Sequence, residues 1–193
     1  MDPSETPFLK KSRFTQFLVG KNGLDESGFK EWIFYPGMLF QALDKWWGNR
    51  GKRERPHEGL DLCFYKDRED RILRLGEKTK IPVLYDGFVV RVMDDFIGKS
   101  IIVEHPPHKN EYPTFCTIYG HTNPDRDLKA GQTVKEGEIL ATLARPTKSQ
   151  NNVPPHLHLS IGWVVEKISY QNLYWETMSM TRTFKWIDPI QVI

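Results

Sequence analysis

No apolar run in this sequence approaches the ~18 residues that a membrane-spanning helix requires, so a spanning segment is not expected. The first residues, Met1 to Lys11, also lack the apolar stretch that is typical of a signal peptide. Either the protein is not exported by that route, or a signal lies outside this sequence. No export signal is visible in the sequence itself.

An excess of charge of one sign is also missing. The chain carries 27 lysines and arginines against 25 aspartates and glutamates, a net charge of +2 with histidine neutral. That balance argues against a nucleic-acid partner, which usually requires a concentrated basic patch. The densest basic run, Arg50 to Arg55, is interrupted by Gly51 and Glu54, and we interpret it as a solvated loop.

Cysteine is scarce, with only Cys63 and Cys116 in the chain. They form no Cys-x-x-Cys pair, which argues against a zinc ribbon or a thioredoxin-like site. Both lie in apolar runs of strand character, where a free cysteine usually packs as a small hydrophobic residue. The sequence leaves open whether the two form a disulfide.

The first fifty residues are rich in large apolar side chains that do not alternate as in a strand. A short helix is predicted from Met38 to Trp47, because apolar residues recur there at three- and four-residue steps. Gly48 to Pro56 is predicted to be an exposed linker. We therefore predict a partly helical N-terminal extension over residues 1–50 and a separate domain over residues 51–193.

From Leu60 onward, short runs of strand character alternate with turn signals, and no helical periodicity of useful length appears. The predicted strands are Leu60 to Tyr65, Phe88 to Met93, Ser100 to Glu104, Thr114 to Tyr119, Glu138 to Leu143, His156 to Trp163 and Asn172 to Met178. This pattern predicts an all-β fold of mainly antiparallel sheets, either a sandwich or an open barrel, with a short helical N-terminal extension.

The first chemical motif pairs His57 with Asp61, four residues later. Imidazole and carboxylate are both common ligands of zinc. The spacing is similar to the helical His-Glu-x-x-His motif with Asp in the last place, but Gly59 would cost about 1 kcal/mol inside a helix. We therefore predict a bend at Gly59 that leads into a strand. Alone, the motif also fits a surface histidine and a capping aspartate.

The second motif is the His-Leu-His run at His156 to His158. Successive strand side chains point to opposite faces, so both imidazoles are expected on one face and the leucines on the other. Two imidazoles on one face can share a metal ion and its water. Alone, the pattern also fits a polar strand face in solvent.

The third motif is a strand that ends in Tyr119-Gly120-His121. A lone histidine in such a place is usually structural or exposed. His105 and His108 lie in a proline-rich loop, and we predict that both are exposed and bind no metal.

The three motifs together fit one site. A catalytic zinc ion needs three protein ligands and one open position for water. His57, Asp61 and either His156 or His158 supply three ligands. The other histidine of that pair and His121 remain for proton transfer and oxyanion stabilisation.

In this order, His-x-x-x-Asp, Tyr-x-His and His-Leu-His resemble the motifs of the lysostaphin/LytM-type zinc endopeptidases. Further segments resemble the family's strands and hairpins, and together they extend the resemblance from about Pro56 to Ile193, with an apparent insertion from Val164 to Lys185. These segments are Pro82 to Val90, Gly98 to His105, Val134 to Leu143 and Ile187 to Pro189.

The resemblance implies a LytM-like barrel-sandwich hybrid and a zinc-dependent endopeptidase that hydrolyses amide bonds in peptidoglycan cross-links or stem peptides. His57, Asp61 and His158 would bind one zinc ion per chain. His121 and His156 would be catalytic. The partner would be a peptidoglycan peptide, and the location would be the cell envelope. The oligomeric state and the particular bond cleaved are not specified.

Several positions depart from the family pattern. Pro154-Pro155 replaces a common glycine, Ser160 replaces a common acidic residue, and Asn151 to Val153 replaces a Gly/Ser-rich loop. These departures lie beside the expected cleft and affect the expected substrate preference, while every expected zinc ligand is present.

Two other functions fit parts of the sequence, and the zinc motifs also fit a peptidase whose natural substrate is not cell wall. A LytM-like domain can bind cell wall or activate an amidase without catalysis, although such domains typically lose zinc ligands. A biotinyl or lipoyl carrier, or a sugar phosphotransferase, shares hairpins like the one around Lys135, but neither accounts for His57 and Asp61. The N-terminal part either covers the cleft or packs against the sheet.

Overall fold

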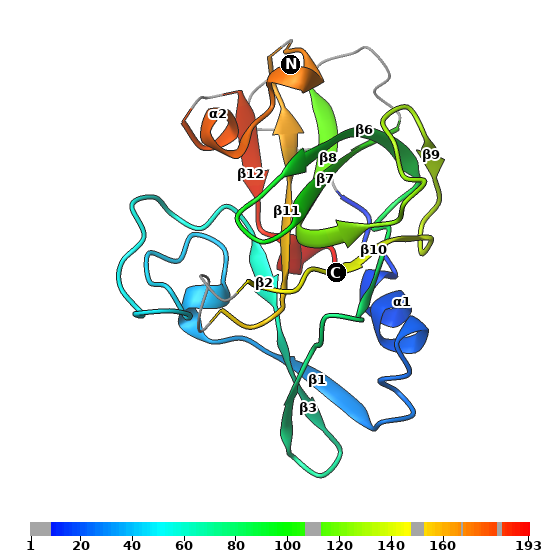
Figure 1. The fold of residues 1–193 in the computed structure, drawn as a ribbon, viewed down its shortest axis with the longest axis vertical. Coiled ribbons are helices and arrows are strands. Elements are labelled where there is room, and N and C mark those ends of the chain that lie inside the picture. The colour runs from blue at the N-terminus through cyan, green and yellow to red at the C-terminus, as the bar shows by residue number, and fades with distance from the viewer. Residues whose placement is uncertain (1–8, 107–112, 148–152, 167, 181–182) are drawn as a thin grey trace.

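Antiparallel strands form most of the computed structural model, which describes residues 9–106, 113–147, 153–166, 168–180 and 183–193 (Figure 1). Within these ranges the strands form two sheets, one of nine strands and one of three. The prediction of an all-β fold of mainly antiparallel sheets with a short N-terminal helix is confirmed. In the same ranges, no helix has the length and apolar character needed to cross a membrane.

The larger sheet carries the segments with the predicted motifs. Its strands are β2 (Leu60–Leu62), β5 (Lys80–Pro82), β6 (Gly87–Asp94), β7 (Lys99–His105), β8 (Thr114–Pro124), β9 (Thr133–Val134), β10 (Ile139–Leu143), β11 (Leu157–Val164) and β12 (Phe184–Ile187). The main path runs β12-β11-β8-β7-β6-β9, β2 pairs with β11, and β10 pairs with β5 and β8. Strand β11 therefore lies between β8 on one side and β2 and β12 on the other.

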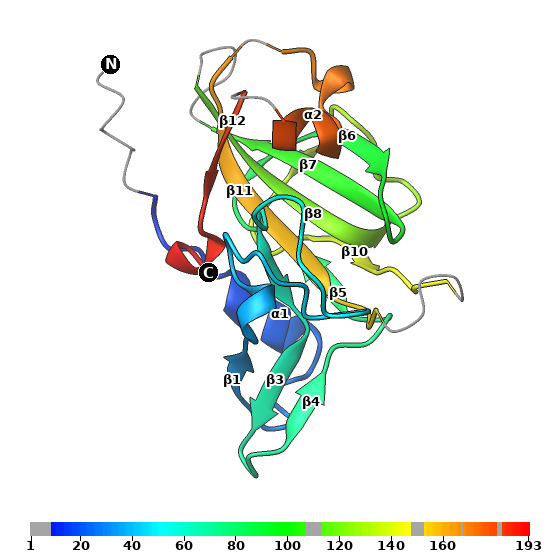
Figure 2. The same ribbon diagram turned by 90° about the vertical axis from the view of Figure 1, so that its left-hand side faces the viewer.

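The smaller sheet joins the N-terminal part to the rest of the chain. It consists of β1 (Phe29–Ile33), β3 (Phe64–Asp67) and β4 (Ile72–Arg74), in the order β1-β3-β4. It projects from one end of the molecule (Figures 1 and 2). The strand predicted from Leu60 to Tyr65 is interrupted at Cys63, where the chain leaves the larger sheet and enters the smaller one.

Alternating side chains of β11 supply two cores. Leu157, Leu159, Ile161 and Trp163 belong to the main core, which also contains Phe14 and Leu18 from helix α1 (Phe14–Lys21). Val164 belongs to a second core, with Leu173 and Met178 from the segment that includes helix α2 (Trp175–Met180). Both faces of the sheet are therefore covered, as the uniformly buried β11 requires.

The N-terminal helix packs against the larger sheet. Phe14 and Leu18 have no exposed surface. After the helix, the Asn22 side chain donates to the carbonyl oxygens of Leu18 (2.8 Å) and Lys80 (2.9 Å), and it accepts from the Lys80 N–H (2.7 Å). These bonds fix α1 beside β5.

The helix predicted from Met38 to Trp47 is wrong. Only a short 3₁₀ helix, η1 (Pro36–Met38), forms at its start. Gln41 has a φ of +64°, which ends any right-handed helix. Backbone groups that a helix would use pair instead with the following segment, as in the bond from the Arg53 N–H to the Leu43 carbonyl (2.7 Å). Hydrogen bonds to a later segment have therefore prevented the helix that the spacing of apolar residues predicts.

The strand predicted from Asn172 to Met178 is also wrong. The structure has a 3₁₀ helix, η3 (Tyr170–Asn172), followed by α2. The Met178 N–H donates to the Tyr174 carbonyl at 2.9 Å, which is a helical bond. Leu173 and Met178 are both buried, whereas a strand would place them on opposite faces. The apolar run was too short to distinguish a helix from a strand.

The two cysteines do not form a disulfide. Cys63 and Cys116 are both free and buried. Burial raises the pKa of the Cys63 thiol to about 12 and also raises the pKa of Cys116. Both thiols therefore remain protonated at neutral pH and pack as small apolar groups.

His105 is buried, so the prediction of exposure is wrong for this residue. Strand β7 extends through His105, which pairs opposite Phe115, and only 2% of its surface is exposed. Its Nδ1 lies 3.0 Å from the Asp86 carbonyl and its Nε2 lies 2.7 Å from Thr117 Oγ1. Burial lowers its pKa to about 4. His108 lies outside the described residues.

The buried His105 makes stability depend on pH. Its folded pKa of about 4 lies below the unfolded value, so the unfolded chain binds the proton more readily. Its contribution is therefore lost as pH falls from about 6.5 toward 4. We expect the wild type to lose about 2 kcal/mol between pH 7 and pH 5 through this group. Urea unfolding of wild type and His105→Gln at both pH values measures it, and equal losses in the two proteins would contradict the assignment.

Candidate metal centre and cleft

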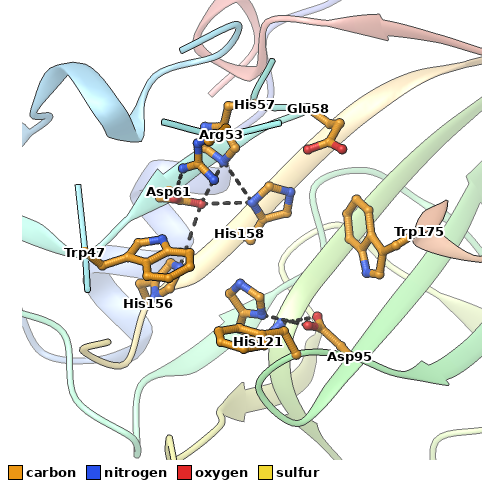
Figure 3. A pocket seen from close by; sticks show the side chains of 11 residues that line it. Trp47, Arg53, His57, Glu58, Asp61, Asp95, His121, His156, His158 and Trp175 are labelled. Carbon is orange, nitrogen blue, oxygen red and sulfur yellow. Dashed lines mark hydrogen bonds and ion pairs between the residues drawn. The ribbon is translucent and has the colours of Figure 1, made fainter. Parts of the chain in front are cut away.

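Strand register brings the predicted motifs together at the middle of the larger sheet. Asp61 on β2 pairs opposite His158 on β11. On the other side of β11, His158 pairs opposite Gly120 on β8, next to His121. His57 lies just before β2, and His156 lies just before β11. All five predicted site residues therefore line one cleft (Figure 3).

Three ligand atoms converge in this cleft. Nε2 of His57 lies 3.1 Å from Oδ1 of Asp61 and 3.1 Å from Nδ1 of His158. Nδ1 of His158 lies 2.9 Å from the same Asp61 oxygen. The three side chains are all buried, and their ligand atoms can hold one metal ion.

The other polar atom of each ligand is held by a neighbour. Nδ1 of His57 lies 2.9 Å from the Leu39 carbonyl, and Nε2 of His158 lies 2.9 Å from Ser160 Oγ. A carbonyl can only accept, so the His57 proton is on Nδ1 and its lone pair on Nε2 points toward the centre. The Ser160 hydroxyl, which replaces the acidic residue expected from the family, orients His158 from the opposite side.

Asp61 is held in its charged form. Burial alone would raise its pKa, but His57, His156 and His158 outweigh burial and keep the pKa well below the usual value. Its second oxygen, Oδ2, accepts a hydrogen bond from Trp46 Nε1 at 2.7 Å. Oδ1 is therefore directed at the two imidazoles.

The donor set fits a divalent cation. Lone pairs of His57 and a carboxylate oxygen of Asp61 face one another at 3.1 Å, an arrangement that repels unless a proton or a cation lies between them. Two imidazoles and one carboxylate, with room left for a fourth ligand, are typical of a zinc site.

His156 lies beside the three residues whose atoms can hold a metal ion and is not part of that group. Its Nδ1 lies 2.8 Å from the Pro154 carbonyl, so the ring proton is on Nδ1. Its Nε2 is buried, has no hydrogen-bond partner among the described residues, and lies 3.9 Å from Asp61 Oδ1. Burial lowers the pKa of His156 to about 4, so the ring is neutral at pH 7 and Nε2 has a free lone pair.

His121 completes the histidine cluster from strand β8. Its ring centroid lies 4.7 Å from that of His156 and 5.7 Å from that of His158. Nδ1 lies 2.9 Å from Oδ1 of Asp95, whose side chain is 2% exposed. Burial would raise the pKa of Asp95, but its bonds with His121 hold that pKa below the usual value.

The cleft has a volume of about 360 Å³ and aromatic walls. Trp47 stacks on Phe96 at 5.8 Å on one side, and Trp175 lies edge-on to His158 at 5.1 Å on the other. Glu58 also lines the cleft and accepts a hydrogen bond from Ser179 Oγ at 2.5 Å. The cleft therefore lies between two aromatic surfaces.

Sequence reasoning missed several residues of this site, among them Trp46, Arg53, Asp95 and Trp175. Arg53 was interpreted as part of a solvated loop, yet its side chain is 15% exposed and its Nη2 lies 3.6 Å from Asp61 Oδ2. These residues lie in irregular or inserted segments with no motif spacing. Only Asp95, an acidic residue beside a predicted strand, carried a weak signal.

A family model described as Peptidase family M23 matches residues 71–171, more than half of the chain. His121, His156 and His158 lie within this range, and His57 and Asp61 precede it. No curated protein matches the chain.

Several solved structures are similar to the chain. A putative peptidase M23 from Pseudomonas aeruginosa is 20% identical over 78% of this chain and 56% of that one, with a TM-score of 0.41. A zinc-containing peptidase from Vibrio cholerae is 22% identical over 69% of this chain and 31% of that one, with a TM-score of 0.39. The lysostaphin catalytic domain from Staphylococcus simulans is 18% identical over 91% of this chain and 93% of that one, with a TM-score of 0.46. The chain thus spans 56% and 31% of the first two structures.

The hydrogen bond from Trp46 to Asp61 predicts a role in metal affinity. Trp46→Phe removes the N–H donor and keeps an aromatic ring against His156 and Phe64. We expect zinc affinity to fall about tenfold or more, as for the loss of other groups that orient a ligand. Competition with a chromogenic chelator measures it. The matched control is Trp47→Phe, from the same segment; equal affinities in the two variants would contradict the prediction.

Proposed function

The chain belongs to peptidase family M23, and on that premise we propose that it is a zinc metalloendopeptidase that hydrolyses amide bonds in peptidoglycan cross-links or stem peptides. The observation that carries the proposal is the buried cluster of His57, Asp61 and His158, beside which Nε2 of His156 has no hydrogen-bond partner in the described part of the chain. This cluster combines a metal site with a group able to accept a proton from water.

His57, Asp61 and His158 would hold one zinc ion per chain. When bound, zinc lowers the pKa of a water molecule toward about 7 and polarises the carbonyl of the substrate. The neighbouring groups Leu39, Trp46 and Ser160 keep the three ligand atoms in place. The ligands therefore need little rearrangement to accept the ion.

The two remaining histidines would handle protons and charge. His156 is neutral at pH 7 because burial lowers its pKa to about 4, and its Nε2 can accept a proton from the attacking water. Once its Nε2 has taken up a proton, His121 would stabilise the oxyanion or pass that proton to the leaving amine. The Asp95 carboxylate, 2.9 Å from His121 Nδ1, would stabilise the positive charge that His121 carries before it gives the proton up.

The partner and the location follow from this proposal. The substrate would be a peptidoglycan peptide, and the protein would act at the cell envelope. We assign the peptidase domain to residues 51–193, which contain all five proposed site residues, and the extension to residues 1–50. The extension contributes Trp46 to the site.

Zinc content is the first test. We expect about one zinc ion per purified chain, and its loss in His158→Ala, because the substitution removes one of three ligands. Elemental analysis measures both. A wild-type chain without zinc after metal is added back would contradict the metal assignment.

The catalytic assignment has a separate test. His121→Ala and His156→Ala should keep zinc and lose turnover by about 10²- to 10⁴-fold, because neither residue is a ligand and both handle protons. Release of amines from purified peptidoglycan and from oligoglycine measures it. Wild-type chain that binds zinc and wall but hydrolyses neither substrate would indicate a non-catalytic wall-binding or amidase-activator domain.

A further inference from the structure

Asp95 is a buried carboxylate that accepts all of its hydrogen bonds. It lies in the turn between β6 and β7, and 2% of its side chain is exposed. Oδ1 accepts from the Ile97 N–H at 3.2 Å and lies 2.9 Å from His121 Nδ1. Oδ2 accepts from the His121 N–H at 2.9 Å and from Ser100 Oγ at 2.6 Å. Two backbone donors and one hydroxyl therefore hold the charged form.

Trp175 extends this hydrogen-bond network through Ser100, whose hydroxyl donates to Asp95 because a carboxylate can only accept. The indole Nε1–H of Trp175 lies 2.9 Å from Ser100 Oγ, and an indole N–H can only donate. Ser100 Oγ accepts this bond, so its own proton is available for the Asp95 oxygen 2.6 Å away. The order of donation is therefore Trp175 to Ser100 to Asp95.

Asp95 holds both the ring and the backbone of His121. His121 has a φ of +63°, a conformation that most side chains avoid, and its N–H donates to the same carboxylate that its ring contacts. The preceding residue leaves little space, because a Cβ on Gly120 would lie 3.2 Å from Asp95 Oδ2 and 3.2 Å from His158 Cβ. The backbone of β8 thus brings His121 against Asp95.

We propose that Trp175, Ser100 and Asp95 form a hydrogen-bonded chain that positions His121, with its proton on Nδ1 and its lone pair on Nε2 in the cleft. The inference rests on the proposed peptidase function, in which His121 acts on the substrate. Trp175, Ser100 and Asp95 are positioning residues, since they act through His121. Every proton that His121 exchanges with substrate then passes through Nε2.

Trp175 also connects this chain to the metal centre. It belongs to α2, in the segment from Val164 to Lys185 that interrupts the family resemblance. The same indole lies edge-on to His158 at 5.1 Å (Figure 3). It also stacks on Trp186 at 6.4 Å. One side chain of the insertion therefore contacts a proposed zinc ligand with its ring and directs His121 with its N–H.

The tautomer of His121 tests the proposal without any activity measurement. Long-range ¹H–¹⁵N correlation spectra of the full ¹⁵N-labelled chain, recorded near about pH 8 where histidine is neutral, distinguish an Nδ1 proton from an Nε2 proton. We expect Nδ1–H in wild type. In Asp95→Asn the proton should move at least partly to Nε2, because a carboxamide cannot accept at both oxygen positions.

Trp175→Phe is the milder variant and the safer one for folding. It keeps an aromatic ring beside His158 and removes only the N–H that donates to Ser100 Oγ and holds this hydroxyl in place. We expect a smaller movement of the His121 proton toward Nε2 than in Asp95→Asn. Trp186→Phe is the matched control, since Trp186 stacks on Trp175 but makes no bond to Ser100 in the described structure, and it should keep the wild-type tautomer.

Activity supplies the second readout. Asp95→Asn should lower kcat about 100-fold with zinc content and KM near wild type, in line with the loss of a group that orients a catalytic histidine. An Nδ1–H tautomer that persists in Asp95→Asn would overturn the proposal. If the spectra of Trp175→Phe equal those of wild type, Trp175 has no part in positioning His121. An inactive wild type would count against the proposed function, while the spectra would still decide the hydrogen-bonded chain.

Discussion

The pairing of β11 with β2 on one side and β8 on the other determines where each polar group of the cleft lies. Asp61 stands opposite His158 in one pairing, and Gly120 stands opposite His158 in the other. A slip of one residue in either pairing would move the side chain to the other face of the sheet. The leucines that alternate with His158 are fully buried in the main core, so apolar burial keeps the register on which the polar cluster depends.

The cluster is unusual in that buried acceptor atoms face one another. Burying polar atoms costs free energy unless each has a hydrogen-bond partner. Segments outside the larger sheet supply these partners. Leu39 orients His57, Trp46 holds Asp61, and the insertion provides Trp175. The segments that resemble no family motif are therefore part of the centre, because they hold the atoms that the family motifs bring together.

The strands, and the meeting of the five proposed residues in one cleft, were predictable because they follow short-range rules. Runs of strand character between turn signals located β6, β7, β8, β10 and β11, and the order of the motifs selected the five residues. The prediction of a helix from Met38 to Trp47 failed, because the backbone of this segment pairs with the segment around Arg53. His105 was placed in a loop because prolines follow it, although β7 continues to that residue. Asp95 and Trp46 act through contacts that only the folded chain creates.

The distance along the chain between the ligands has a consequence for biosynthesis. His57 and His158 are 101 residues apart in sequence, yet their ring nitrogens lie 3.1 Å apart. Closing a loop of that length carries an entropy cost that is recovered only when the intervening strands have formed. A nascent chain that has not yet exposed β11 from the ribosome lacks His158, one of the three residues whose atoms can hold a metal ion. The candidate metal centre can therefore form only after β11 has been synthesised.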